Sequence, residues 1–343
     1  MSPVRCLFLS AVSMALAVPV AAAELLVGNK AADTLWRLSL EDGRRLGETA
    51  TAAGPHEIAV APDGATAVVS EYGRQAPGHT LGVYATADGR LLRRIGLGRH
   101  TRPHGMRFTA DGSRLLVTAE GSDALLVVDP AAATVERAID LGPGKGHMVA
   151  LAPGDAVAYV SKVGAGTVVR VDLASGQVRE APAGAGAEGI AVAADGTVWV
   201  SNREDGTVTV HDPDTLQVLD TLASPGFPIR VALTPDGRHA LVTNARAATL
   251  AVFDVASRRA VATVALAQPG VEYRPTMLGR AALPIGAIAD PSGRRVYVAV
   301  SGGNQVAVVD TGSWTVVERW ATGDEPDALG IVPPHAASGT RGD

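Results

Sequence analysis

An internal repeat is the feature that most constrains how this chain can fold. Near-copies of the segment PHGMRFTADG recur along almost the whole sequence, beginning at Pro55, Pro103, Gly146, Ala187, Pro228, Pro284 and, in shortened form, Pro326. Each copy is followed by a second apolar run, a third that mostly ends in Asp, and a fourth. Four short apolar runs in each unit of ~40–45 residues are typical of the four-stranded antiparallel blade of a β-propeller.

The two ends of the chain complement each other. Six full units fit between Pro55 and Glu325, and the C-terminus then supplies only a first run, ALGIV. The N-terminus supplies the three missing runs, ELLVGN, TLWRLSL and RRLGETATA. Sharing one sheet between the termini closes the ring and removes exposed sheet edges. We therefore expect an all-β, seven-bladed β-propeller of four-stranded antiparallel blades, with one blade closed by both termini.

The first 23 residues have the features of a secretory signal peptide. Arg5 is their only charge, an apolar run spans Cys6 to Val20, and three alanines precede Glu24. We predict a signal peptide over 1–23, a single propeller domain over 24–333 and a disordered tail over 334–343. No later stretch approaches the ~20 apolar residues of a membrane span. The expected location is the periplasm or the exterior, without a membrane anchor.

Composition narrows the classes of partner. Cys6 is the only cysteine, so the exported chain would have no disulfide and a large core must stabilise it. Without Arg5 the chain has 29 basic and 35 acidic residues. This mildly acidic balance argues against nucleic acid and anionic membranes as partners.

Two repeat units carry a family resemblance. The segments VSNREDGTVTVHDPDTLQV and LVTNARAATLAVFDVASRRAV resemble the YVTN-type β-propeller repeat of exported bacterial proteins, and the pattern extends over essentially all of the mature chain. The resemblance implies seven blades and an exported protein. It implies little about function, because propellers host many unrelated activities.

One repeat position stands out chemically. It is the start of the innermost strand of each unit, close to the mouth of the central channel, and reads in order His56, His104, His147, Glu188, Ile229, Ile285 and Asp327. Neutral imidazoles beside carboxylates suit a divalent metal such as zinc. We predict His56, His104, His147 and Glu188 as metal ligands. The alternative is that each histidine is a structural residue at the start of its strand.

We expect the same face of the ring to gather the connections between second and third strands. Three departures from the minimal repeat also fall there: the long first-unit loop EYGRQAPGHT, the segment GRHTR and the insertion GVEYRPTMLGRAA. From these segments we predict ligand-binding residues: Glu71, Tyr72, Arg99, Arg102, Arg203 and Arg274. Arginine suits an anionic or carboxylate-bearing ligand. The expected partner is a small anionic ligand or a periplasmic protein, and the alternative is that these arginines form a solvated rim.

A narrower resemblance concerns two units only. The motif PHEI at His56 followed by PHGM at His104, with Glu120 after the run LLVT, is similar to the paired motifs of streptogramin-type lyases. That resemblance implies His104 as general base, Glu120 as a metal carboxylate, and His56 as a substrate or base partner. The aromatic second-strand pattern of those lyases is absent here.

Three functions follow from these features. The first is a ligand- or protein-binding module that uses the His- and Arg-rich face. The second is a metal-assisted lyase or lactone hydrolase built on His56, His104 and His147, with His104 and Glu120 as catalytic residues. The third is a redox partner of a quinoprotein or cytochrome. The sequence has no CxxCH haem motif to support it. The binding module is the preferred hypothesis.

Overall fold

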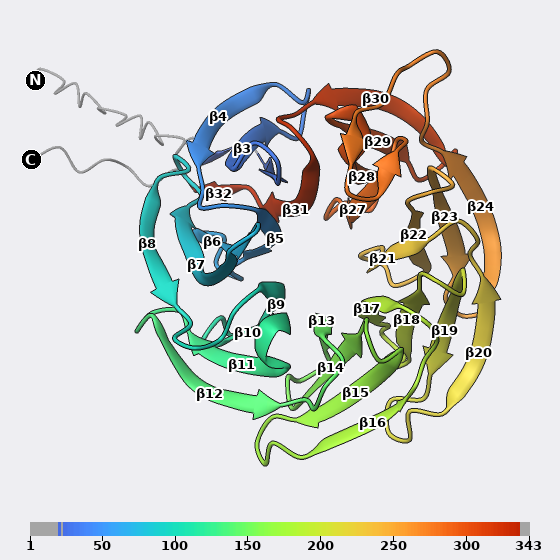
Figure 1. The fold of residues 1–343 in the computed structure, drawn as a ribbon. Helices are drawn as coiled ribbons and strands as arrows, with labels where there is room; N and C mark the ends of the chain where they lie inside the picture. Colours follow the sequence, from blue (N-terminus) through green and yellow to red (C-terminus); the bar gives the residue numbers. More distant parts are fainter. Residues whose placement is uncertain (1–19, 22, 337–343) are drawn as a thin grey trace, which may run out of the picture.

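The computed structural model describes residues 20–21 and 23–336, and it forms a ring of seven four-stranded sheets around a central channel (Figure 1). All pairings within a blade are antiparallel, and in six blades sequence order runs from the channel outward. The first two blades comprise β5 (Pro55–Val60), β6 (Thr66–Gly73), β7 (Pro77–Ala85) and β8 (Leu91–Gly96), then β9 (Pro103–Phe108), β10 (Leu115–Ala119), β11 (Ala124–Asp129) and β12 (Thr134–Asp140). The predicted fold class is confirmed.

The next four blades repeat this order. Blades three and four comprise β13 (Gly146–Leu151), β14 (Val157–Lys162), β15 (Thr167–Asp172), β16 (Val178–Pro182), β17 (Ala187–Val192), β18 (Val198–Asn202), β19 (Thr207–His211) and β20 (Val218–Ala223). Blades five and six comprise β21 (Pro228–Leu233), β22 (His239–Asn244), β23 (Thr249–Asp254), β24 (Arg259–Ala265), β27 (Pro284–Ala289), β28 (Arg295–Val300), β29 (Gln305–Asp310) and β30 (Thr315–Ala321). Short 3₁₀ turns follow two of the second strands, η1 (Glu120–Ser122) and η2 (Ser301–Gly303).

The seventh blade joins the two ends of the chain, as predicted from the single run at the C-terminus and the three runs at the N-terminus. Its innermost strand β31 (Pro326–Val332) pairs with β2 (Glu24–Asn29), which leads outward to β3 (Thr34–Ser39) and β4 (Arg45–Ala50). Beside it, β1 (Val20–Ala21) pairs with β32 (His335–Ala336). Most of the predicted signal peptide and tail, residues 1–19, 22 and 337–343, lies outside the described residues.

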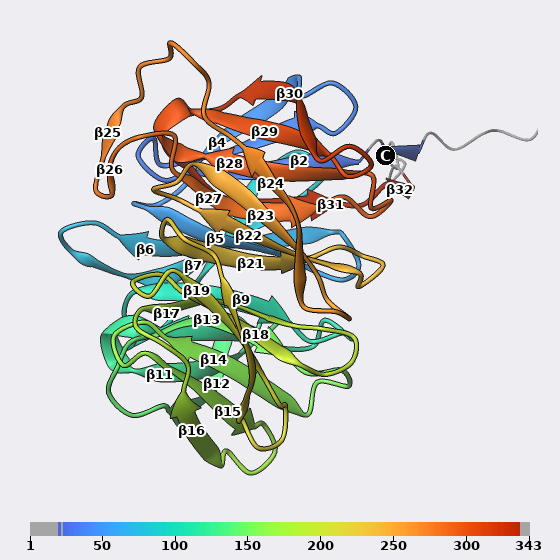
Figure 2. The same ribbon diagram turned by 90° about the vertical axis from the view of Figure 1, so that its right-hand side faces the viewer.

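One insertion departs from the repeat. Between blades five and six the chain forms a small hairpin, β25 (Pro275–Thr276) and β26 (Gly279–Arg280), which stands out from one face of the ring (Figure 2). Within the described part of the chain, no helix is long and apolar enough to cross a membrane.

The apolar core lies between neighbouring blades. Strand side chains alternate between the two faces of each sheet, so every blade packs against both of its neighbours. For example, Leu81 and Ile95 of the first blade pack with Phe108 and Val117 of the second. The ring is therefore a rigid frame whose inner strands hold fixed positions around the channel.

Candidate functional site

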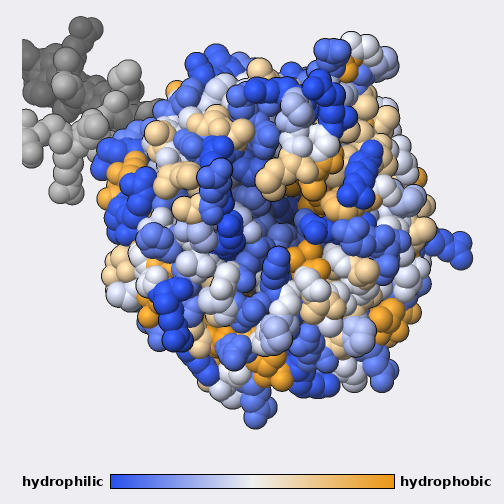
Figure 3. Space-filling view, in the orientation of Figure 1, coloured by the Kyte–Doolittle hydropathy of each residue, from blue (hydrophilic) through white to orange (hydrophobic). Residues whose placement is uncertain are grey.

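A cavity of about 390 Å³ occupies one mouth of the channel. All seven residues at the chemically distinct repeat position line it: His56, His104, His147, Glu188, Ile229, Ile285 and Asp327. The space-filling view shows a central hollow bordered largely by hydrophilic residues on this face (Figure 3). The hairpin residues Thr276, Met277 and Leu278 also border the cavity, and Met277 is 92% exposed.

A backbone irregularity repeated in every blade directs these side chains. In the second blade Pro103 pairs with Ala119 and Met106 with Val117, so His104 and Gly105 together face the single residue Thr118. Such a β-bulge interrupts the alternation of side chains and re-aims them. The other six innermost strands show the same shift at the same place. Strand alternation from the sequence alone groups His104 with the packing residues Met106 and Phe108, and the bulge releases it from that face.

A hydroxyl from the neighbouring blade fixes the bulged residue. Thr118 Oγ1 donates to the carbonyl oxygen of His147 at 2.6 Å, and Ser201 Oγ donates to that of Ile229 at 2.9 Å. Thr243 Oγ1 donates to the carbonyl oxygen of Ile285 at 2.8 Å, and Ser161 makes the same contact to Glu188. In these four blades the Ser or Thr that precedes the last residue of the second strand therefore ties that blade to the ring position of the next.

Two imidazoles and one carboxylate converge on the cavity wall. Ligand-type atoms of His104, Glu120 and His147 all lie within 4.8 Å of one another. The rings of His104 and His147 have centroids 3.8 Å apart, and that of His56 lies 4.6 Å from His104. The predicted metal ligand Glu188 lies next to this group, with Oε1 3.5 Å from His147 Nε2. Glu120 reaches the cluster because η1 begins directly after β10.

Strong electrostatic coupling joins His147 to the two carboxylates. Burial alone would lower its pKa, but hydrogen bonds and charge attraction from Glu120 and Glu188 outweigh burial and raise the pKa of His147 to about 9. The converse holds for Glu120: burial opposes its ionisation, yet His147, His104 and a hydrogen bond from Tyr72 lower its pKa to about 2. At neutral pH His147 is an imidazolium that donates through Nδ1 to an ionised Glu120.

The other two histidines are neutral. Burial is the main cause that holds the pKa of His56 and of His104 well below the ordinary value, and nearby cations add to it. The Nδ1 atoms of both are buried and have no hydrogen-bond partner among residues 20–21 and 23–336. Tyr72 stacks on His56 with centroids 4.6 Å apart and donates from its hydroxyl to Glu120 Oε2 at 2.6 Å. Unpartnered buried ring nitrogens are free to bind a proton or a metal ion.

The predicted ligand-binding residues divide into two groups. Tyr72 and Arg203 line the cavity, and Arg203 Nη1 donates to Glu188 Oε2 at 2.6 Å. The other four do not line it: Glu71, Arg99, Arg102 and Arg274.

The second group is held elsewhere by its own contacts. Glu71 is buried within its blade, where Arg94 Nε lies 3.1 Å from its carboxylate. Arg102 lies over the ring of Tyr72, 5.0 Å from its centroid, and Arg274 pairs with Asp324. Arg99 is exposed.

Glu57, Lys145 and Arg230 line the cavity but were not singled out from the sequence. Glu57 and Arg230 follow ring positions in opposite blades and meet across the channel, with Arg230 Nη2 2.5 Å from Glu57 Oε1. Lys30 pairs with Asp327 at 2.8 Å, and Lys145 lines the cavity without an ion pair among the described residues. A comparison of the residue after each ring position would have identified Glu57 and Arg230, since Gly or Ala occupies it in four of the other blades.

Comparisons with known proteins agree with the fold. The family model described as YNCE-like beta-propeller matches residues 148–272. Comparison with curated proteins gave no significant match. Among solved structures, a functionally unknown protein from Desulfotomaculum acetoxidans superposes with a TM-score of 0.75 and 15% identity, covering 91% of this chain and 99% of that one.

Two further structures are similar in fold. A putative 6-phosphogluconolactonase from Bacteroides fragilis has a TM-score of 0.69 and 16% identity, covering 90% of this chain and 98% of that one. Kuenenia stuttgartiensis hydrazine synthase has a TM-score of 0.67 and 18% identity, covering 80% and 88%. At these identities the likeness concerns the fold alone. The chain is a seven-bladed β-propeller that matches the YNCE-like β-propeller family over residues 148–272.

Proposed function

We propose that this propeller binds a small anionic ligand in the channel-mouth cavity, at a first-row divalent cation held by His104, Glu120 and His147. The observation that carries the proposal is the convergence of three ligand-type atoms within 4.8 Å at the wall of a cavity. Two ligands to one zinc ion at ~2.1 Å can be no more than ~4.2 Å apart, so a small side-chain adjustment suffices.

The protonation states support this donor set. His104 is neutral and its Nδ1 has no partner, so it offers a free lone pair. Glu120 is ionised, and a cation would replace the proton of His147 as the positive partner of that carboxylate. Three protein ligands leave a further position for an exogenous ligand, as in open zinc sites.

Charge around the cavity favours an anion. Four cationic side chains (Lys30, Lys145, Arg203 and Arg230) and five carboxylates (Glu57, Glu120, Glu188, Glu325 and Asp327) line it. With all imidazoles neutral the lining carries one negative charge, and a dication would reverse this to one positive charge. A monoanion would restore neutrality, and the unpaired Lys145 could contact it at the rim.

Metal titration tests the proposal. The EDTA-treated mature protein should bind one zinc or other first-row ion in isothermal titration calorimetry, followed by metal analysis after desalting. His104→Ala, Glu120→Gln and His147→Ala should each weaken binding by about tenfold or more, as loss of one ligand implies. His79→Ala, an exposed histidine on the same face, is the matched control. Equal metal content in wild type and all three site variants would refute the metal site.

Lactone hydrolysis is a second candidate. It is favoured by His56, a neutral imidazole with an unpartnered Nδ1 at the same cavity. Such a group can accept a proton from water that attacks a lactone carbonyl, after which the ring C–O bond breaks and the alkoxide takes up a proton. A cation at the site would polarise the carbonyl. The fold is also similar to that of a putative 6-phosphogluconolactonase.

A His56 variant distinguishes catalysis from ligand binding alone. If the site hydrolyses lactones, metal-loaded protein should open a panel of phosphorylated and plain sugar lactones, and His56→Ala should lower kcat by about 100-fold while zinc affinity stays unchanged. No turnover by metal-loaded wild type across the panel would leave binding alone as the function.

A further inference from the structure

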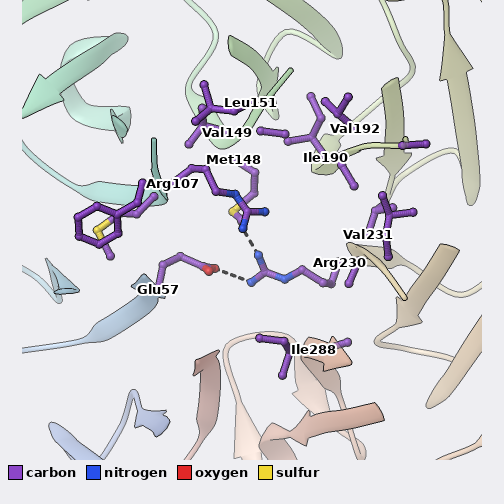
Figure 4. A pocket seen from close by; sticks show the side chains of 18 of the residues that line it. Glu57, Arg107, Met148, Val149, Leu151, Ile190, Val192, Arg230, Val231 and Ile288 are labelled. Carbon is purple, nitrogen blue, oxygen red and sulfur yellow. Dashed lines mark hydrogen bonds and ion pairs between the residues drawn. The ribbon is translucent and has the colours of Figure 1, made fainter. Parts of the chain in front are cut away.

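A second cavity, of about 580 Å³, occupies the opposite end of the channel (Figure 4). It is lined by the later residues of the innermost strands. Most of these residues are apolar, including Met106, Phe108, Val149, Ile190, Val231 and Ile288, while charged side chains supply much of the polar wall. Glu57, Met148 and Arg230 line both cavities. Together these three residues form a partition between the two ends of the channel.

One position of the repeat that borders this cavity is occupied by a small residue in nearly every other blade. Three residues after the ring position, the other six innermost strands have Ala59, Ala150, Ala191, Ala232, Ile288 and Gly330. In the second blade this position is Arg107, whose side chain is exposed to the cavity. Packing does not require a guanidinium there, because Ala or Gly occupies the same position in five of the other six blades and Ile in the sixth.

Arg107 has no partner for its charge. None of the residues at positions 20–21 and 23–336 forms a side-chain hydrogen bond or ion pair with it. The nearby carboxylate, Glu57, is already engaged by Arg230 Nη2 at 2.5 Å, and Arg230 Nη1 also contacts Met148 Sδ at 3.5 Å. Figure 4 shows Glu57 and Arg230 directed toward each other across the cavity, with Arg107 directed into the same space. Two guanidinium groups thus share one carboxylate at this point of the cavity, and none of the described residues forms an ion pair with Arg107. The other carboxylate of the lining, Asp155, accepts a hydrogen bond from the backbone N–H of Ala110.

We propose that this second cavity binds an aliphatic monocarboxylate, with Arg107 pairing its carboxylate and the apolar walls enclosing its chain. A planar guanidinium matches a carboxylate through two parallel hydrogen bonds. The volume lies within the ~300–1,000 Å³ typical of small-molecule pockets. Asp155 lies on the lining near the outer end, so its negative charge disfavours ligands with a second anionic group.

This site is independent of the metal cluster. Arg107 borders the second cavity and not the first, whereas His104, Glu120 and His147 border the first and not the second. A carboxylate would therefore bind to metal-free protein, and substitutions in the metal cluster would leave that binding unchanged.

Calorimetry with sodium octanoate on the EDTA-treated mature protein tests the proposal. We expect 1:1 binding that is weakened about tenfold or more by Arg107→Met, which keeps the bulk of the side chain and removes its charge. Arg107→Lys should retain part of the affinity. Octan-1-ol should bind at least about tenfold more weakly than octanoate because it lacks the carboxylate. Butyrate should also bind at least about tenfold more weakly because its chain is four carbons shorter.

Two control variants make the result specific. Arg99→Met removes an exposed arginine outside both cavities, and His147→Ala alters only the first cavity. Both should bind octanoate as wild type does. Absence of octanoate binding, wild-type affinity in Arg107→Met, or equal affinity for octanol would each overturn the proposal. Circular dichroism and the unfolding temperature of Arg107→Met establish that the variant is folded.

Discussion

The imidazolium of His147 should make the stability of the metal-free protein depend on pH in a specific window. Its pKa is raised from the ordinary 6.5 to about 9 in the folded state. A raised pKa means that the folded state binds the proton more tightly than the unfolded state does. The stabilisation is therefore fully present below pH ~6.5, declines as pH rises, and is lost above pH ~9. His147→Gln abolishes the titration and keeps a side chain of similar size.

The magnitude follows from the shift. One pKa unit corresponds to ~1.36 kcal/mol, so the difference between 6.5 and about 9 corresponds to about 3 kcal/mol. His147 and Glu120 have side chains only 12% and 8% exposed, so solvent screens the pair weakly. The lowered pKa of Glu120 describes largely the same pair from its other partner, and the two shifts are not added.

Urea unfolding of wild type and His147→Gln in EDTA, at pH values from 6 to 9.5, measures the effect. The difference in free energy of unfolding between the two proteins should shrink by about 3 kcal/mol across this range. Glu120→Gln, which removes the main partner, should flatten the wild-type profile. Parallel profiles for wild type and His147→Gln would show that His147 is not an imidazolium in the folded protein, and the electrostatic description of the cluster would be wrong.

Three further results are expected. Thr118→Val removes the hydrogen bond to the carbonyl oxygen of His147, so it should lower the free energy of unfolding by about 1 kcal/mol and weaken zinc binding. Thr118→Ser should retain both the stability and the zinc affinity. Unchanged zinc affinity in Thr118→Val would contradict the proposed link between blades. Glu57→Gln leaves Arg230 without its carboxylate and should destabilise the protein by about 2–4 kcal/mol in thermal unfolding. The double variant Glu57→Gln with Arg230→Gln should recover part of this loss. If the effects of the two substitutions on the free energy of unfolding were additive, the ion pair would be contradicted. Mass spectrometry of the protein from the periplasmic fraction or the medium should find an N-terminus near Glu24. An intact Met1 would contradict cleavage of the predicted signal peptide.

The sequence predicted the architecture well because the repeat encodes it redundantly. The complementary runs ALGIV and ELLVGN determined how the ring closes, and β31 pairs with β2 accordingly. The ring position was also found by alignment, since every innermost strand begins at the same phase of the repeat. The direction in which the ring-position side chains point could not be predicted. It depends on the bulge after Pro103, which arises from pairing between two strands and is not visible in the sequence of either strand alone.

The other features that the sequence did not predict depend on contacts between segments far apart in the chain. Glu120 and His147 belong to different blades and meet only through the ring geometry, so the coupled pair had no sequence signal beyond the separate motifs. Arg107 follows the packing residue Met106 and was not distinguished from a solvated strand residue. Its significance depends on Glu57 being already occupied by Arg230, a contact between residues far apart in the chain.

The ring position has a further consequence for anything that enters the channel mouth. Its polar members occupy adjoining blades, whereas Ile229 and Ile285 pack with Leu278 and Leu283 beneath the inserted hairpin. The mouth is therefore divided into a hydrophilic arc and a hydrophobic arc. A ligand with one polar and one apolar end would match the two arcs in one orientation. If the cavity binds such a ligand, it should discriminate between positional isomers of the same charge and size.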